Sequence, residues 1–512
     1  MVRLDMLAAG LLAFCMITPS LAKIPTNQQN IRDIFKIDDR DPAQFPSSCL
    51  RRINPADPNS PIIWSKTASF GARQYPLANI WYQAYSMVVQ ARTVLQASMW
   101  LKNFEVMKSI YSFWGLKPDK VDGKYVEPRA LWQVQKITAI RRRYEGVQAM
   151  METVRADDDR QKPKIWCDGT YLLHIDVDRD PMRDATGRLI VKEDRTGYYS
   201  VREWEAKWGR TVDDRWFLYY QVGPAPEDER AYITIPREAA PEGEERNQYP
   251  FPLDTVTGHP NPCKVTTRNA MVLHAQRPAA DANGGMGAYA QAEHIILCPR
   301  SFLDGRMDED DYFLRTKMVE NGSILLDAMK VVVLTLFHEF LHLVYPNGCP
   351  DVYPCLPKKD ASGTISEKFP HFQSGFDCDR SPRPIYGAGQ AMSLARWEVA
   401  LDDSVDPPVE FTKIREMWSW QTPEPFAWFA RAMQMTLFAK QDWSDGTCRP
   451  AGSKFTGCTA RIPEFSAAKG KRVDGEGEGI EIVEQVEGCG EDADLEGPDR
   501  VVGDVALDGP TG

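Results

Sequence analysis

The chain has 512 residues and a formal net charge of −11, with 26% charged residues and a pI near 5.4. Because nucleic acids and anionic membranes repel an acidic surface, this balance argues against both as partners. A chain of this length can bury a sizeable core, arranged as one large domain or as two smaller ones.

The N-terminus has the pattern of a secretory signal peptide. A short basic start leads into an apolar run, Leu7–Ile17, and the small residues Ser20 and Ala22 precede the expected cleavage point. The run is too short to span a bilayer comfortably, and Pro19 follows it. We therefore expect residues 1–22 to be removed and the mature protein to be secreted and extracellular, with no membrane association after cleavage.

Composition divides the remaining chain into three parts. Residues 23–60 are rich in Pro, Asn and Asp, which predicts a poorly structured leader or propeptide. Residues 61–445 are expected to form the main domain. Residues 459–512 carry many Gly, Glu and Asp and few aromatic residues, so they cannot bury enough surface to fold and are predicted to be a disordered acidic tail.

The main domain alternates helical and strand patterns. Apolar residues recur at helical spacing in 78–95, 130–140, 388–398 and around 426–433. Strands bounded by turn residues are predicted at 166–176, 216–222, 231–235 and 294–299. The mixture predicts an α+β domain. His294, at the start of the last strand, is either a metal ligand or, as is commoner at such a position, a structural residue.

One five-residue run carries the predicted chemistry: His338-Glu339-Phe-Leu-His342, at the end of the apolar stretch Val331–Phe337. Two histidines four residues apart lie on one face of a helix, where both imidazoles can reach a single metal ion. The glutamate beside the first histidine can accept a proton from water that the metal activates. This is the H-E-x-x-H pattern of zinc metallopeptidases. The alternative is a buried helix with two hydrogen-bonded histidines and no metal.

A third zinc ligand is needed, because catalytic zinc commonly takes three protein ligands and keeps a fourth position for water. The sequence after His342 does not continue as H-x-x-G-x-x-H. The carboxylates closest behind the motif are Asp351, Asp377 and Asp379, and the next helix offers Glu398, whose surroundings do not mark it out. Each aspartate is equally readable as a turn residue that bonds its own backbone.

Four features resemble the fungal secreted aspzincins, the group of deuterolysin and the peptidyl-lysine metallopeptidases. They are Trp-Cys-Asp-Gly at 166–169, the strand 295–299, the His338–His342 helix, and the segment 385–395 followed by 422–430. The resemblance spans roughly residues 60–440. It implies a zincin-like domain built around an active-site helix that carries the H-E-x-x-H motif.

The resemblance also implies an aspartate before a Tyr-Gly pair as third ligand, but the family spacing falls here on Arg383. The nearest preceding acids rank first and second, Asp379 and then Asp377, with Asp351 third. The tyrosine of that pair, Tyr386, is the implied stabiliser of the oxyanion, with Tyr353 as second choice.

Motif and resemblance together predict a secreted, zinc-dependent endopeptidase acting on protein or peptide substrates. Zn²⁺ held by His338, His342 and Asp379 would activate water, and Glu339 would act as general base and return the proton to the leaving amine. A peptidyl-lysine preference would require acidic groups in the substrate pocket. The alternative is a catalytically inactive secreted binding protein of the same fold, which the altered aspartate spacing favours. A structural zinc module is disfavoured, because Glu339 would then have no task.

Cysteine usage agrees with secretion. Ten cysteines remain after the loss of Cys15, and an even number in a secreted chain predicts disulfides of open connectivity. Local pairings of Cys349 with Cys355 and of Cys448 with Cys458 are among the options. The sequon at Asn321 predicts a glycoprotein, or else a plain loop before the motif helix.

Overall fold

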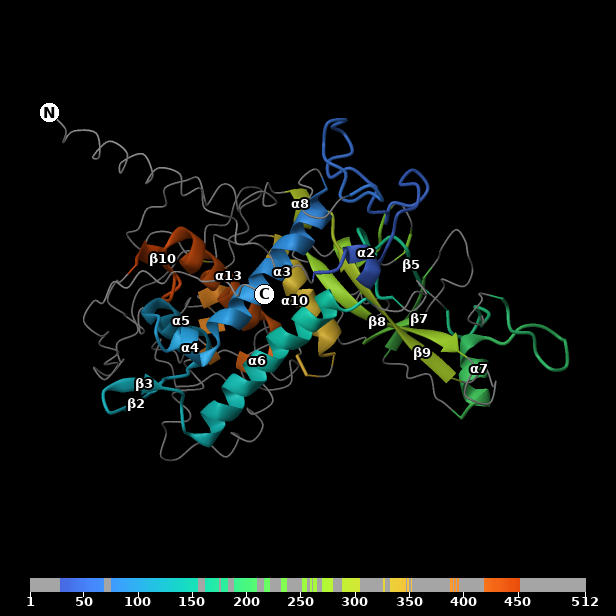
Figure 1. The fold of residues 1–512 in the computed structure, drawn as a ribbon. Helices are drawn as coiled ribbons and strands as arrows, with labels where there is room; N and C mark the ends of the chain where they lie inside the picture. Colours follow the sequence, from blue (N-terminus) through green and yellow to red (C-terminus); the bar gives the residue numbers. More distant parts are fainter. Residues whose placement is uncertain are drawn as a thin grey trace, which may run out of the picture.

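The structure is a computed structural model that describes only part of the chain. The described residues are 28–68, 75–154, 162–174, 176–182, 188–209, 216–221, 232–236, 251–255, 258–259, 261–264, 269–279, 288–303, 326, 332–346, 348–349, 351, 387–389, 391–392, 394–395 and 419–451. They form a mixed arrangement of helices and sheet (Figure 1). Within these ranges, no helix is both long and apolar enough to cross a membrane.

A seven-stranded mixed sheet forms one side of the molecule, in the order β1-β4-β9-β8-β7-β6-β5. The strands are β1 (Lys36–Ile37), β4 (Lys164–Trp166), β9 (Ala288–Leu297), β8 (Ala270–Ala279), β7 (Tyr232–Pro236), β6 (Trp216–Gln221) and β5 (Leu172–His174). The pairs β1–β4 and β4–β9 are parallel, whereas all pairs from β9 to β5 are antiparallel. Strand β4, which has a parallel neighbour on each side, is three residues long and fully buried, as is typical of parallel strands.

Five longer helices pack together beside the sheet: α3 (Pro76–Val94), α5 (Phe104–Trp114), α6 (Leu131–Glu152), α10 (Val332–Val344) and α13 (Pro423–Ala439). Helix α10 contacts α3, α6 and α13 on the helical side and β8 and β9 on the sheet side (Figure 1). The smaller elements are α2 (Ile31–Ile34), α4 (Ala97–Trp100), α7 (Val201–Lys207), α8 (Arg300–Leu303), the 3₁₀ turns Pro262–Lys264 and Ser419–Gln421, and the hairpins β2 (Asp119–Val121)–β3 (Lys124–Val126) and β10 (Gln441–Asp442)–β11 (Arg449–Pro450).

Helix α10 is central because it is apolar on nearly every side, and such a helix is stable only when it is surrounded. The Phe340 ring lies 5.8 Å from Phe35 and 5.5 Å from Trp81, and the Phe337 ring stacks on Tyr144 at 6.0 Å. Fully burying each such side chain stabilises the fold by about 1.5–3 kcal/mol. The ionisable motif is therefore held inside the molecule by its apolar neighbours.

Most elements with a clear local pattern were predicted. Helix α3 matches the prediction for 78–95, and β6 and β7 match the strands predicted at 216–222 and 231–235. Helix α6 begins as predicted and continues beyond the predicted range 130–140 to Glu152. Helix α5 was missed, although the Asn103 side chain caps its start and Gly115, at φ 64°, ends it.

The prediction that residues 23–60 are poorly structured is wrong for residues 28–60. Strand β1 pairs in parallel with β4 at the edge of the sheet, and Phe35 is buried in the core. A disulfide joins Cys49 to Cys167 directly after β4. The Pro- and Asn-rich composition gives no sign of Ile37 and Cys49, whose partners Ile165 and Cys167 lie more than a hundred residues away. This segment is an integral part of the fold.

Several predicted features lie outside the described residues. These are the signal peptide at 1–22, the acidic tail at 459–512 and the Asn321 sequon. A second disulfide joins Cys263 to Cys298. Cys349 is a buried thiol, and its predicted partner Cys355 lies outside the described residues, as does Cys458.

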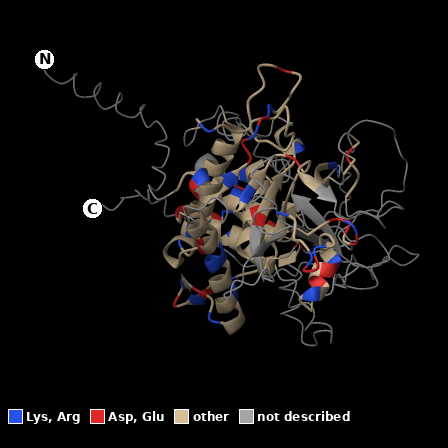
Figure 2. Cartoon of the chain, turned by 90° about the vertical axis from the view of Figure 1, so that its right-hand side faces the viewer, with Lys and Arg blue, Asp and Glu red and all other residues tan. Residues whose placement is uncertain are grey.

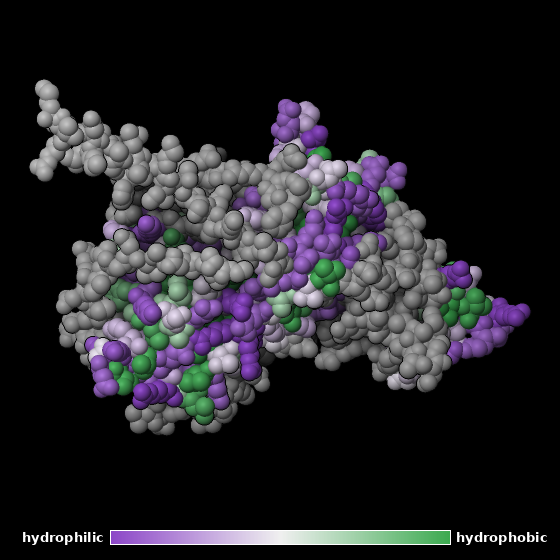
Figure 3. All heavy atoms as spheres, in the orientation of Figure 1, coloured by the Kyte–Doolittle hydropathy of each residue, from purple (hydrophilic) through white to green (hydrophobic). Residues whose placement is uncertain are grey.

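The described surface carries charges of both signs. In Figure 2 the ribbon positions of Lys and Arg are interspersed with those of Asp and Glu along the described part of the chain. Figure 3 shows hydrophilic residues over much of the described part of the face in view, with hydrophobic residues in small groups between them. Residues of the two charge signs are therefore mixed along the described ribbon.

Candidate metal centre

Helix α10 brings the two histidines of the motif together, as their spacing predicts. The Nε2 atoms of His338 and His342 are 3.0 Å apart, and their ring centroids are 4.8 Å apart. Because a helix turns about 100° per residue, Glu339 lies about 60° around the helix from His342. The three motif residues therefore occupy one side of α10.

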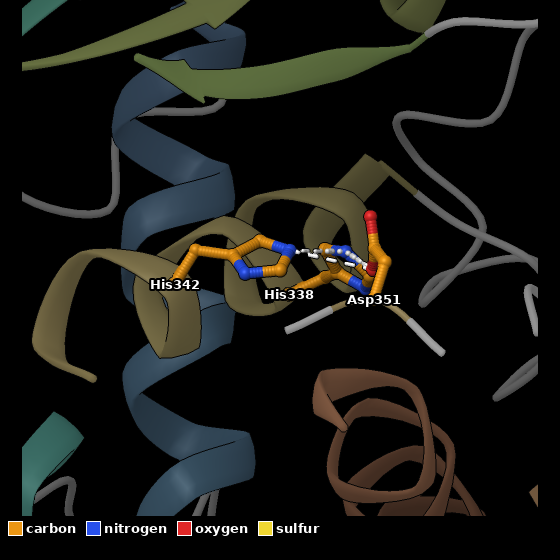
Figure 4. A group of neighbouring side chains, drawn as sticks. All are labelled: His338, His342 and Asp351. Atoms are coloured by element: carbon orange, nitrogen blue, oxygen red, sulfur yellow. Dashed lines mark hydrogen bonds and ion pairs between the residues drawn. The ribbon is translucent and has the colours of Figure 1, made fainter. Parts of the chain in front are cut away.

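Asp351 is the carboxylate that the structure brings to the two imidazoles. Its Oδ1 atom lies 3.2 Å from His338 Nε2 and 3.4 Å from His342 Nε2, and Figure 4 shows all three groups pointing toward one another. Zinc bonds to nitrogen and oxygen ligands are about 2.0–2.1 Å long, so the edges of a tetrahedral site measure about 3.3–3.4 Å. The three observed distances of 3.0, 3.2 and 3.4 Å fit such a site.

The second ring nitrogen of His338 faces another carboxylate. Its Nδ1 atom lies 2.8 Å from Oε2 of Glu424, in the first turn of α13, and the Trp428 indole Nε1–H donates to Glu424 Oε1 at 2.8 Å. Metal-binding histidines commonly donate their other N–H to a carboxylate in this way, which fixes the tautomer and the ring orientation. Glu424 is 86 residues from His338 in the sequence and was not among the predicted site residues.

His338 lies between the carboxylates of Asp351 and Glu424, an arrangement that favours a positive charge at its ring. A neutral imidazole has one N–H and can donate to only one of Asp351 and Glu424. Burial lowers the pKa of His338, but the charge of Asp351 and hydrogen bonds to Asp351 and Glu424 raise it more, so the pKa lies well above its usual 6.5. Either a second proton or a metal ion at Nε2 would satisfy both carboxylates.

Asp351 is the counterpart of this effect. Burial raises the pKa of the Asp351 carboxyl, but the charges and hydrogen bonds of His338 and His342 outweigh burial and hold it well below its usual 3.8. Asp351 is therefore ionised at neutral pH, as a metal ligand has to be.

The centre is partly accessible. The exposed fraction of the side chain rises from 9% for His338 to 18% for His342 and 23% for Asp351. Catalytic zinc keeps one open ligand position, whereas structural zinc is closed by four protein ligands. Glu339 itself is buried, with 5% of its surface exposed.

The predicted site residues have different outcomes. His338 and His342 come together with Asp351, which we ranked third, and Glu339 follows His338 on the same helix. The first two choices for the third ligand, the two predicted tyrosines and the helical glutamate lie outside the described residues: Asp379, Asp377, Tyr386, Tyr353 and Glu398.

His294 does not join the metal centre. It lies on β9, where its Nδ1 atom contacts Trp166 Nε1 at 3.2 Å and the Tyr171 hydroxyl at 3.0 Å. The structural interpretation of His294 therefore describes it better than the interpretation as a ligand.

Glu424 was missed although it belongs to the segment 422–430 that contributed to the resemblance. The available signal was a glutamate in a helical first turn with a tryptophan four residues later, on the same helix face. This pattern predicts the hydrogen bond between Trp428 and Glu424, but it does not predict the contact of Glu424 with His338 on another helix.

No protein-family model, no curated protein and no solved structure matches this chain. The similarity to the aspzincins is therefore a prediction that rests on the motifs themselves. The geometry of the metal centre has to carry the functional argument.

Proposed function

We propose that the chain is a secreted zinc-dependent endopeptidase of zincin-like fold, acting on protein or peptide substrates. The observation that carries the proposal is the spacing of His338 Nε2, His342 Nε2 and Asp351 Oδ1 at 3.0–3.4 Å from one another. The hydrogen bond that His338 Nδ1–H donates to Glu424 supports it, because this outer carboxylate orients the other ring nitrogen toward the metal.

The donor set favours zinc among the common metal ions. Two imidazole nitrogens and one carboxylate oxygen suit zinc, whereas calcium and magnesium prefer oxygen ligands alone. Three protein ligands with partial exposure are typical of a catalytic site rather than a closed structural one.

Zinc bound at this centre would supply a Lewis acid that polarises water and the scissile carbonyl. Glu339 accepts the proton of the attacking water at its carboxylate and gives it to the leaving amine nitrogen. Glu424 holds the His338 ring in place during this step. Tyr386 stays our proposed donor to the oxyanion, from the resemblance alone.

One observation favours a second candidate, an inactive binding protein of the same fold. A general base has to reach water and substrate, yet only 5% of the Glu339 surface is exposed. In that case the centre would bind zinc and hydrolyse nothing. Zinc content and hydrolysis therefore have to be measured on the same preparation.

The test is casein hydrolysis by the mature protein, with and without a zinc chelator, beside the Glu339→Gln variant. We expect the chelator to abolish hydrolysis and added zinc to restore it. Glu339→Gln should keep its zinc and lose about 10²–10⁴-fold in rate, which is the usual contribution of a general base. Glu145→Gln, at an exposed position of α6, is the matched control and should be fully active.

The outcomes separate the candidates. Hydrolysis at an unchanged rate in the presence of the chelator, or full activity of Glu339→Gln, contradicts the proposal of a zinc-dependent peptidase. A zinc-loaded wild-type protein without hydrolysis of any peptide substrate favours the binding protein. A wild-type protein that binds no zinc contradicts both.

A further inference from the structure

A short segment links the end of α10 to the proposed third ligand. Helix α10 ends at Val344, and Asp351 follows seven residues later. Within this segment the amide of Gly348 donates to the carbonyl of Tyr345 at 3.0 Å, which closes a turn. The position of Asp351 Oδ1 therefore depends on what holds this turn against the rest of the protein.

Tyr345, the residue after the end of α10, packs against helix α6. Its hydroxyl donates to the backbone carbonyl of Arg142 at 2.8 Å, a contact of 203 residues in sequence separation. The ring fits there because position 146 is glycine. A Cβ atom on Gly146 would overlap the Tyr345 hydroxyl and lie 2.9 Å from the ring carbon Cζ.

Arg143, one turn away on the same helix, holds the other end of the turn. Its Nη2 donates to the carbonyl of Gly348, three residues before Asp351. The guanidinium carbon lies 5.2 Å from the Tyr345 ring centroid and 5.7 Å from that of Phe426 on α13, within cation–π range. Only 9% of the Arg143 surface is exposed, so these contacts form away from solvent.

We propose that Arg143 and Gly146 are positioning residues for the metal centre. Arg143 fixes the Gly348 carbonyl, Gly146 provides the space for Tyr345, and together they hold Asp351 beside the two imidazoles. The inference rests on the proposed metal site. It gives α6 a role in positioning Asp351, which neither the motif nor the resemblance implies. Neither residue touches the metal or the substrate, so both act through Asp351.

Helix α6 also contacts the helix that carries the outer carboxylate. The Tyr144 hydroxyl donates to the carbonyl of Phe426 at 2.8 Å, two residues after Glu424. A change in α6 could thus act through α13 or through general stability instead of through Asp351. The experiment has to separate these routes.

A double-mutant cycle makes the separation, because two residues that act through one contact are not additive. The zinc dissociation constant is measured by competition with a chromophoric chelator, at fixed pH and salt. The variants are Arg143→Met and Gly146→Ala, each in the wild-type background and together with Asp351→Asn. Arg142→Met, at the exposed neighbouring position, is the matched control.

We expect each α6 variant to weaken zinc binding about 10–100-fold when Asp351 is present, the usual effect of losing an outer-shell partner. In the Asp351→Asn background the same changes should alter the constant less than about twofold, and Arg142→Met should bind as the wild type does. Gly146→Ala is the sharper variant, because alanine is the better helix former and the added Cβ is opposed mainly by the Tyr345 ring, with Val344 Cγ1 at 3.3 Å as a second close neighbour.

Far-UV circular dichroism and thermal unfolding without metal establish that each variant is folded. If Arg143→Met does not fold, Gly146→Ala and Tyr345→Phe decide, the latter with a loss of at most about tenfold. Equal weakening in both backgrounds, or unchanged zinc binding by the folded variants, overturns the inference. A wild-type protein without zinc affinity overturns the proposed function, and the inference with it, before any variant is compared.

Discussion

Two buried histidines of this protein have opposite electrostatic surroundings. His294, on β9, is fully buried, and its Nδ1 atom must accept from Trp166, because an indole can only donate. Burial and the charge of Lys164 hold the pKa of His294 well below 6.5. His338, on α10, lies between Asp351 and Glu424, and its pKa lies well above 6.5.

Burial alone therefore does not make a histidine a metal ligand. Both rings are shielded from water, so desolvation disfavours the charged form in both. A ring among donors and cations stays neutral, and it becomes part of the core. A ring between two carboxylates attracts a positive charge, which a proton or a metal ion can provide.

The largest expected effect comes from removing the ring that both carboxylates share. We expect His338→Gln to weaken zinc binding by more than about 100-fold, since even outer-shell partners are worth 10–100-fold. The measurement is chelator competition on the purified protein. His274→Gln, on the exposed face of β8, is the matched control and should bind zinc normally. Equal zinc affinity of the two variants would contradict the assignment of the centre to α10.

The second largest effect on zinc binding is expected from a change in the outer carboxylate alone. Glu424→Gln keeps an oxygen that can accept from His338 Nδ1 but removes the charge. We expect zinc binding to weaken about 10–100-fold with the fold retained. Glu145→Gln, which removes an exposed carboxylate elsewhere, should have no effect. Unchanged zinc affinity in Glu424→Gln would mean that Glu424 is a packing partner of Trp428 only.

The residues of the metal centre were predicted from the sequence only in part. The pair of histidines and Glu339 follow from spacing on one helix, which is local information. Asp351 ranked third because nothing local favours it over Asp377 and Asp379. Its place beside the imidazoles depends on the turn that α6 holds, through a contact between Arg143 and Gly348 that spans 205 residues.

In the fold, too, the elements with a local sequence pattern were predicted, and an element that depends on a distant partner was not. Helices α3 and α13 and strands β6 and β7 were predicted because the spacing of apolar residues within each segment indicates its secondary structure. Strand β1 is two residues long, and its residues pair with β4 at Lys164 and Ile165. Two residues show no periodicity, so the prediction for 23–60 depended on composition alone, and it was wrong for residues 28–60.

A third prediction uses pH to distinguish a proton from a metal at His338. Because the pKa of His338 is raised in the folded protein, its ion pair stabilises the metal-free protein fully below about pH 6.5 and is lost as pH rises through the raised value. The lowered pKa of Asp351 stabilises above about pH 3.8 and is lost as pH falls through the lowered value. The pair therefore stabilises the metal-free protein most between these two pH values.

Zinc has the opposite dependence, because it must displace the proton from His338. We expect zinc affinity to rise by up to about tenfold per pH unit while one proton is displaced. The measurement is the increase in unfolding temperature on adding a fixed free zinc concentration, at pH 5.5, 6.5 and 7.5. The increase should grow with pH. A constant or shrinking increase would indicate that zinc does not compete for the His338 ring.

The smallest effect on the metal is expected at His294, and it tests the other half of the comparison. His294→Phe keeps an aromatic ring but removes the acceptor of the Trp166 indole, and an unsatisfied buried donor costs about 1–3 kcal/mol. Urea unfolding should report this loss, while zinc affinity stays within about twofold of the wild type.

The pH dependence of that variant makes the test stricter. His294 is neutral in the fold, so its contribution is present above about pH 6.5 and is lost as pH falls through its lowered pKa. His294→Phe should therefore lose less stability than the wild type between pH 7 and pH 5, although it is less stable at pH 7. If the variant instead lost zinc, the two histidines would belong to one coupled centre, and the distinction drawn from their neighbours would fail.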